Sequence, residues 1–377
     1  MRSASKPNEA PLSARAERNL GVDALRILAI ALIVMLHTLN QTGLIHCYRA
    51  DGPVLQQLGE NLVRIGGMGV TIFALISGYV LYPGRWRPER FLALWLQVVL
   101  LSLSLCVIGE LIQPGSVEPE FWIRSAFPVT QRCFWYFSCY SFAFLLSPIV
   151  NRGVAALDRK QTLGLFWGVL GLSSGGSFLG YVYYGDTFAL AGGFSAMWLV
   201  CMYVVGACVR KERIFFRAAR WKLRLCAVGL IVLNGLIAWR VQLAGMSVAP
   251  FSKYSTPFLV LPSVALLVLA ARLEIRGRAA RALVRGIAPL CFGVYVVHVH
   301  HTVWSRLELC LISFKYAPTW QLLVLIPGFM LLIFVPSALY DWLRLRLFRL
   351  LRLDRFCARI VRGLRRLWDR LCRTFAD

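Results

Sequence analysis

The stretch GVDALRILAIALIVMLHTLN, residues 21–40, decides the fold class. It is almost entirely apolar, and a helix of twenty residues is about 30 Å long, which matches the hydrocarbon core of a bilayer. Three side chains interrupt it, namely Asp23, Arg26 and His37. The stretch therefore predicts a membrane-spanning helix that carries a polar stripe.

The rest of the chain repeats this pattern. Hydrophobic residues make up 58% of the 377 residues and charged residues only 16%, which excludes an ordinary soluble domain. We predict an all-α polytopic membrane protein with about ten transmembrane helices. The expected spans cover residues 20–42, 62–82, 91–112, 133–150, 161–181, 194–209, 223–243, 256–272, 287–305 and 319–340.

The formal net charge is +24, and the basic residues lie mainly between the expected spans and in the tail. Basic segments follow the second, fourth, sixth, eighth and tenth expected spans, whereas the intervening segments carry almost no basic residues. Basic residues accumulate on the cytoplasmic side of membrane proteins. We therefore expect a bacterial-type inner (plasma) membrane, with both termini in the cytoplasm and membrane lipid rather than nucleic acid as the partner of the arginines.

Three regions are expected. Residues 1–18 contain Ser and Pro and are expected to form a disordered cytoplasmic N-terminus, and residues 19–342 form the transmembrane domain. In the tail, residues 343–377, arginines recur every three or four positions and leucines fill the other face. This pattern predicts a C-terminal amphipathic helix that lies on the membrane surface.

The polar stripe of the first span is the leading candidate for chemistry. Arg26 and His37 are eleven residues apart, so they share a helix face about 16 Å apart along the axis. Arg26 has an alternative role, since it can extend toward the headgroups and pair with Asp23 one turn earlier. A histidine at membrane depth needs a partner or a cavity, which makes His37 a functional candidate.

Two further segments contain candidates with simpler explanations. Ser77-Gly78-Tyr79 interrupts an apolar helix, where Gly78 permits close helix packing and Ser77 can bond to its own helix. Trp135 and Tyr136 fall at an expected membrane boundary, where an aromatic belt accounts for them.

A fourth segment, CFGVYVVHVHH at residues 291–301, concentrates histidines. Tyr295 and His298 are three residues apart and share a helix face, as do His298 and His301. Few acidic residues lie nearby in the sequence, so a metal site is disfavoured. The stronger interpretation is that His298 lines the same cavity as His37.

These motifs together resemble the acyltransferase-3 family of integral membrane acyltransferases. The resemblance rests on DALR followed by His37, then FALISGYVL, FWYFSCYSFAFLLSP and FGVYVVH, in this order over residues 19–340. It implies that Arg26 and His37 form the family's Arg-x10-His pair, and that Ser77, Gly78 and Tyr79 form its serine-glycine-aromatic segment. Two positions depart from the family pattern, because Ala93 replaces an arginine and Thr38 replaces a carboxylate.

The resemblance implies transfer of an acyl group, usually acetyl from acetyl-CoA, to a hydroxyl of a lipid-linked or cell-surface carbohydrate. Acetyl-CoA is then a co-substrate, and no tightly bound cofactor or metal is expected. His37 is expected to act as general base or as transient acyl carrier, and both roles remain open. Ser77, Tyr79, Tyr295 and His298 are candidates for holding the acceptor or an oxyanion.

Coenzyme A carries phosphates, so its site is expected among cationic side chains. The candidates are Arg85, Arg87, Arg90, Arg210, Lys211 and Arg213. Two other classes of function compete with the enzyme. A transporter or flippase for a glycan or lipid intermediate also needs a polar track, and a lipid-bound scaffold needs only the basic tail.

Overall fold

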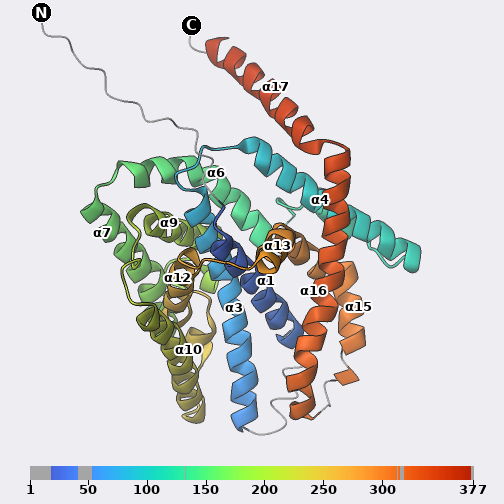
Figure 1. Cartoon of the computed structure of the whole chain (residues 1–377). Coiled ribbons are helices and arrows are strands. Elements are labelled where there is room, and N and C mark those ends of the chain that lie inside the picture. Colours follow the sequence, from blue (N-terminus) through green and yellow to red (C-terminus); the bar gives the residue numbers. More distant parts are fainter. Residues whose placement is uncertain (1–17, 41–52, 132, 312, 315–317, 375–377) are drawn as a thin grey trace, which may run out of the picture.

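The computed structural model describes residues 18–40, 53–131, 133–311, 313–314 and 318–374, and every regular element in these ranges is a helix (Figure 1). The all-α prediction is confirmed for this part of the chain. The longer helices are α1 (Leu20–Asn40), α3 (Pro53–Leu81), α4 (Pro88–Ile112), α6 (Trp135–Ala156), α7 (Arg159–Leu170), α9 (Ala196–Glu212), α10 (Arg220–Leu243), α12 (Pro257–Ala271), α15 (His301–Leu311), α16 (Thr319–Leu350) and α17 (Leu353–Thr374). The shorter ones are α5 (Pro119–Ala126), η1 (Gly171–Gly176), α8 (Ser177–Tyr183), η2 (Ala191–Gly193), α11 (Ala249–Ser252), α13 (Arg278–Ile287), η3 (Ala288–Leu290) and α14 (Cys291–His298).

Within the described residues, eight helical segments are long and apolar enough to cross a membrane. They coincide with eight of the ten expected spans, so the chain is an integral membrane protein. The other two expected spans, 133–150 and 194–209, correspond to α6 and α9, and α9 has only 17 residues. The count of ten therefore stays a prediction.

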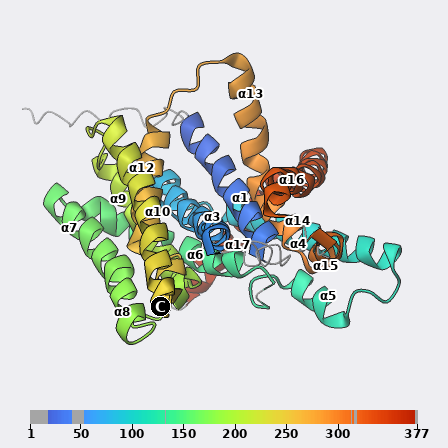
Figure 2. The same cartoon turned by 90° about the horizontal axis from the view of Figure 1, so that it is seen from below.

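Small residues let α3 pack closely between two neighbours. A Cβ atom at Gly69 would lie 2.4 Å from the carbonyl oxygen of Ala29 in α1, and one at Gly78 would lie 1.9 Å from that of Tyr203 in α9. Such contacts hold helices together in a membrane, where apolar burial alone gives little driving force. Figure 2 shows α1 and α9 on either side of α3. The close contact at Gly78 agrees with the expectation that this glycine permits close helix packing.

One end of the bundle, here called the basic end, contains the start of α1 and the ends of α3 and α12. Asn19 caps α1 there, because its Oδ1 accepts from the Val22 amide at 3.0 Å and its Nδ2 donates to the Ala271 carbonyl at 2.9 Å. Asn151 near the end of α6 donates to the Leu81 carbonyl at 3.2 Å. The basic segments that were predicted to be cytoplasmic turns therefore begin at this end.

The expected span 287–305 is not one continuous helix. It consists of η3, α14 and the first part of α15, and the helix breaks at Val299 and His300. His300 caps the start of α15, because its Nδ1 accepts from the Thr302 amide at 3.3 Å and its carbonyl accepts from the Trp304 amide at 2.8 Å. The break turns His298 and His300 toward different neighbours.

The tail also differs from the expected boundary at residue 343. Helix α16 continues to Leu350, Arg352 adopts a φ of 52°, and α17 begins at Leu353. Figure 1 shows α17 extending away from the end of α16. Its amphipathic surface placement stays a prediction. The predicted disordered N-terminus lies outside the described residues except for Arg18.

Candidate active site

Two histidines from distant parts of the chain meet inside the bundle. His37 Nδ1, in the last turn of α1, lies 2.9 Å from His298 Nε2, at the end of α14. The two ring centroids are 5.1 Å apart, and the edge of Trp304 packs on His37 at 6.0 Å. His298 thus contacts His37 directly, but it is not among the residues that line the cavity beside His37, where the sequence predicted it.

A backbone carbonyl sets the direction of this hydrogen bond. His298 Nδ1 lies 2.6 Å from the Val294 carbonyl oxygen, which can only accept, so Nδ1 carries the proton. When both rings are uncharged, His298 Nε2 has a lone pair and accepts from His37 Nδ1. His37 Nε2 is then left with its lone pair available. This assignment of tautomers follows from the hydrogen-bond network.

Thr38 follows His37 where a carboxylate was expected from the resemblance, and its hydroxyl donates to the Val34 carbonyl at 2.8 Å. The group that orients His37 comes from another span, and it is the imidazole of His298 rather than a carboxylate.

His37 faces a cavity of about 260 Å³, here called the histidine cavity. Its walls are mostly aromatic, and within the described part of the chain none of the lining residues is Asp, Glu, Lys or Arg. Tyr295, an expected acceptor residue, is among them, and so are Trp135 and Tyr136, for which the aromatic-belt interpretation required no cavity. The lining residues are Ile33, Leu36, His37, Asn40, Val70, Phe73, Trp135, Tyr136, Phe194, Tyr254, Phe292 and Tyr295.

Arg26 lies elsewhere on α1. Its Nη1 donates to Asp23 Oδ1 at 2.7 Å, and Arg18 binds the other carboxylate oxygen. The alternative in which Asp23 pairs with Arg26 is thus the one that the geometry supports. Arg26 is not among the residues that line the histidine cavity.

Three of the expected coenzyme A residues do come together. Arg85, Arg87 and Arg90 line a cavity of about 120 Å³ at the basic end, here called the arginine cavity, with Tyr140 and Asn151 on its other walls. Proline at the start of α4 allows the chain to turn sharply there, which brings the three arginines to one opening.

A third, small cavity lies between these two. It has a volume of about 10 Å³ and is lined by Ser77, Tyr136, Tyr140, Ala74, Leu81, Ala143, Phe144, Leu199 and Tyr203. It shares Tyr136 with the histidine cavity, and it shares Leu81, Tyr140 and Phe144 with the arginine cavity. The three cavities therefore form a row from the basic end to His37. This connecting cavity is about the size of one water molecule.

The other predicted residues have partners of their own. Ser77 donates to the Phe73 carbonyl at 2.9 Å, which is the local bond expected for a serine within a helix. Tyr79 is buried away from the histidine cavity, and its hydroxyl accepts from Arg210 at 3.2 Å. Lys211 donates to the carbonyl oxygens of Val154 and Leu157, so it caps the end of α6.

Arg213 and His301 are likewise separate from the histidine cavity. Arg213 ends α9 in a left-handed conformation and packs over the Phe216 ring at 5.0 Å. His301 stacks on Phe121 of α5, with the ring centroids 4.0 Å apart.

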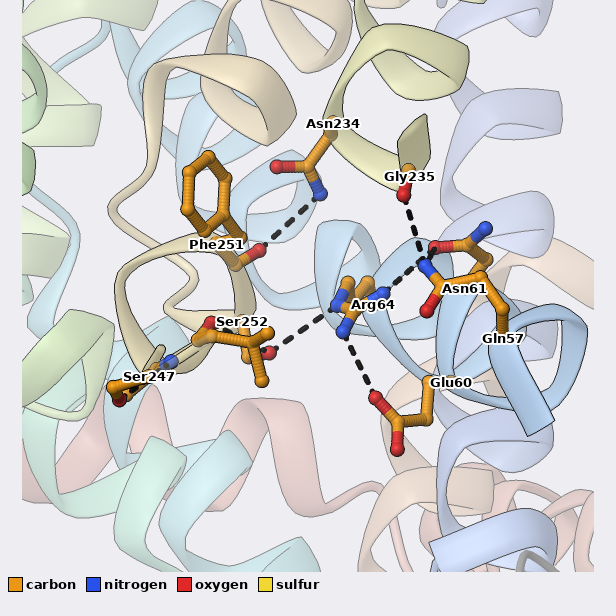
Figure 3. A network of polar contacts seen from close by, with 11 residues as sticks. Gln57, Glu60, Asn61, Arg64, Asn234, Gly235, Ser247, Phe251 and Ser252 are labelled. Atoms are coloured by element: carbon orange, nitrogen blue, oxygen red, sulfur yellow. Dashed lines mark hydrogen bonds and ion pairs between the residues drawn. The ribbon is translucent and has the colours of Figure 1, made fainter. Parts of the chain in front are cut away.

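A buried polar network supports the cavity wall from the far end of α3 (Figure 3). Arg64 is only 3% exposed, and it donates to Glu60 at 2.9 Å, Asn61 at 2.8 Å and Ser252 at 3.2 Å. Ser252 lies two residues before Tyr254, which lines the histidine cavity. Sequence reasoning missed Arg64, although the four-residue spacing of Glu60 and Arg64 in an apolar helix was a usable signal.

One comparison with known proteins gives a match. A family model described as an acyltransferase domain, that of the acyltransferase-3 family, matches residues 19–340, which include His37, His298, the residues that line the three cavities and all ten expected spans. Neither a curated protein nor a solved structure gives a match to this chain.

Proposed function

The chain belongs to the acyltransferase-3 family, and on this premise we propose that it moves an acetyl group from acetyl-CoA to a hydroxyl of a lipid-linked or cell-surface carbohydrate. The observation that carries the proposal is the hydrogen-bonded pair of His37 and His298, of which His37 lines a mostly aromatic cavity. A base whose tautomer is fixed, beside a cavity that a substrate can enter, is what acyl transfer to an alcohol needs.

In the proposed reaction His37 Nε2 takes the proton of the acceptor hydroxyl while that oxygen attacks the thioester carbonyl. The C–O bond forms, the C–S bond breaks, and the coenzyme A thiolate leaves and takes the proton from His37. The charged imidazole that forms in between keeps its Nδ1 hydrogen bond to His298. The alternative, in which His37 Nε2 carries the acyl group itself, uses the same lone pair and the same partner.

We propose that the donor arrives from the basic end. The phosphates of coenzyme A bind Arg85, Arg87 and Arg90, and the pantetheine arm passes Ser77 toward His37. The row of three cavities supports this route. The connecting cavity must widen, which rotation of the Tyr136 and Tyr140 side chains allows. We do not assign Lys211 to the coenzyme A site, because its ammonium group already donates hydrogen bonds to backbone carbonyl oxygens.

The histidine cavity supports an uncharged acceptor group. Its aromatic rings offer faces for the apolar surface of a sugar ring, and the lining residues that the structure describes include no cation to pair with a phosphate or carboxylate. We place the basic end in the cytoplasm of a bacterial-type inner membrane, so that the acceptor arrives from the opposite side.

A transporter or flippase is the competing function, since a row of cavities across the bundle also describes a route for a solute. The two functions differ in what they consume. An acyltransferase in detergent releases free thiol from acetyl-CoA without any membrane to cross, whereas a transporter needs two compartments. A scaffold predicts no thiol release at all.

The test is a His37→Ala variant of the purified chain, assayed for thiol release from acetyl-CoA in the presence of extracted membrane glycolipid. We expect a loss of about 10²-fold to 10⁴-fold, as for removal of a general base. A Thr302→Ser variant controls for effects of mutation and purification that do not involve His37. The melting temperatures of the unchanged chain and of both variants show whether each is folded. Full turnover by a folded His37→Ala protein would refute the assignment.

A further inference from the structure

A groove that takes no part in the proposed reaction lies on the outside of the bundle. It has a volume of about 310 Å³ and runs between α1, α10 and α12 at the basic end. It shares no lining residue with the histidine, arginine or connecting cavities. The lining residues are Gly21, Ala24, Leu25, Leu28, Arg220, Arg224, Leu266, Leu269, Ala270 and Leu273.

The groove joins an apolar floor to a cationic end. Of its ten lining residues among those that the structure describes, eight are apolar, two are arginines and none is acidic. Arg220 uses Nη2 to donate to the Arg272 carbonyl at 3.2 Å, which leaves its other N–H groups for a ligand. Arg224 is exposed one turn further along α10. Two guanidinium groups side by side match the oxygens of a phosphate.

The groove covers about two thirds of the depth of one bilayer leaflet. Arg220 and Arg224 lie in the first two turns of a spanning helix, at the level of the lipid headgroups. From Gly21 to Leu28, α1 runs about 10 Å toward the bilayer centre, roughly a third of the hydrocarbon thickness. Trp221 and Leu225 on the neighbouring face of α10 are exposed, as expected for side chains that contact lipid.

We propose that this groove binds one anionic phospholipid of the surrounding bilayer. The phosphate lies between Arg220 and Arg224, and the upper part of one acyl chain lies along Leu28, Leu266 and Leu269. The lipid thereby fills the space beside the start of α1, the helix that carries His37. At the wall of the groove α1 already packs closely on α12, because a Cβ at Gly21 would lie 2.0 Å from the Ala270 carbonyl oxygen.

The test titrates phosphatidylglycerol into the purified full-length chain in a neutral detergent and follows the melting temperature. A lipid that binds only the folded state raises this temperature, and the rise grows with the ratio of the lipid concentration to its dissociation constant. We expect phosphatidylglycerol to raise the melting temperature and phosphatidylcholine to leave it unchanged. In the double variant Arg220→Gln, Arg224→Gln, the phosphatidylglycerol concentration needed for the same rise should increase about thirty-fold, as expected for two arginines at a charged surface.

Two further variants separate a built site from diffuse attraction. Arg278→Gln, Arg285→Gln removes the same charge from the exposed face of α13, outside the groove, and should change the lipid concentration needed for the same rise less than twofold. Ala24→Phe fills the groove without changing the charge and should weaken binding as the arginine variant does. An equal response to phosphatidylcholine, an equal effect of the α13 variant, or displacement of the lipid by acetyl-CoA would overturn the proposal.

Discussion

At the scale of single residues, one carbonyl oxygen decides which nitrogen of His37 is basic. The Val294 carbonyl binds the proton on His298 Nδ1, and His298 Nε2 in turn accepts from His37 Nδ1. The chain of two imidazoles therefore ends in a lone pair on His37 Nε2. An imidazole does here what a carboxylate does in other sites, and it adds no negative charge to an apolar region.

This arrangement predicts different effects for two substitutions of His298. His298→Leu leaves the His37 Nδ1 proton without an acceptor and the tautomer unfixed, so kcat should fall about 10²-fold or more. His298→Gln restores an acceptor oxygen near the position of Nε2 and should recover a large part of that loss. The measurement is kcat for thiol release at saturating acetyl-CoA. Equal kcat values for the Leu variant and the unchanged protein would contradict the relay.

Sequence spacing could predict only the short-range part of this site. Asp23 and Arg26 pair because they are three residues apart on one helix. His37 was identifiable because an ionisable side chain at membrane depth is costly unless it has a partner or a cavity. The contact between His37 and His298 joins residues 261 positions apart, and spacing within one helix does not encode it. The sequence likewise placed Trp135 in an aromatic belt at the membrane boundary, whereas it lines the histidine cavity. Its orientation depends on tertiary packing, which the sequence does not show directly.

At the scale of helices, α3 is the element on which the row of cavities depends. It packs on α1 through Gly69 and on α9 through Gly78, and it supplies Ser77 to the connecting cavity. The sequence indicated where the helices lie, because long apolar runs are a strong signal. The break at Val299 and His300 was missed, because it depends on the side chain of His300 capping α15 and bonding to Ser102 of α4 at 3.1 Å.

Gly78→Ala tests the close approach of α3 and α9. The added methyl group would meet the Tyr203 carbonyl, so we expect the protein to lose about 1–3 kcal/mol of stability against unfolding in a denaturing detergent. Gly164→Ala in α7 is the matched control, because a Cβ there has open space around it. That variant should be neutral or more stable by up to about 1 kcal/mol. Similar losses for both would show that the helix crossing tolerates a wider spacing.

At the scale of the whole molecule, the charge distribution predicts the orientation in the membrane. Cys310 in α15 and Cys372 in α17 are both exposed, and the expected topology places them on opposite sides. In single-cysteine variants, an impermeant thiol reagent added to intact cells with a permeable outer layer should label Cys310. Cys372 should react only after the inner membrane is opened. The reverse labelling would place the basic end outside the cell.

The connecting cavity has a consequence for the cell that hosts this protein. Acyl transfer across the bundle requires openings from both faces, yet the passage between them narrows to about 10 Å³ beside Ser77 and Tyr136. A space of this size holds about one water molecule. We therefore expect this constriction to limit the leak of protons and sodium ions along the proposed route, so that the protein does not dissipate the electrochemical gradient of its membrane.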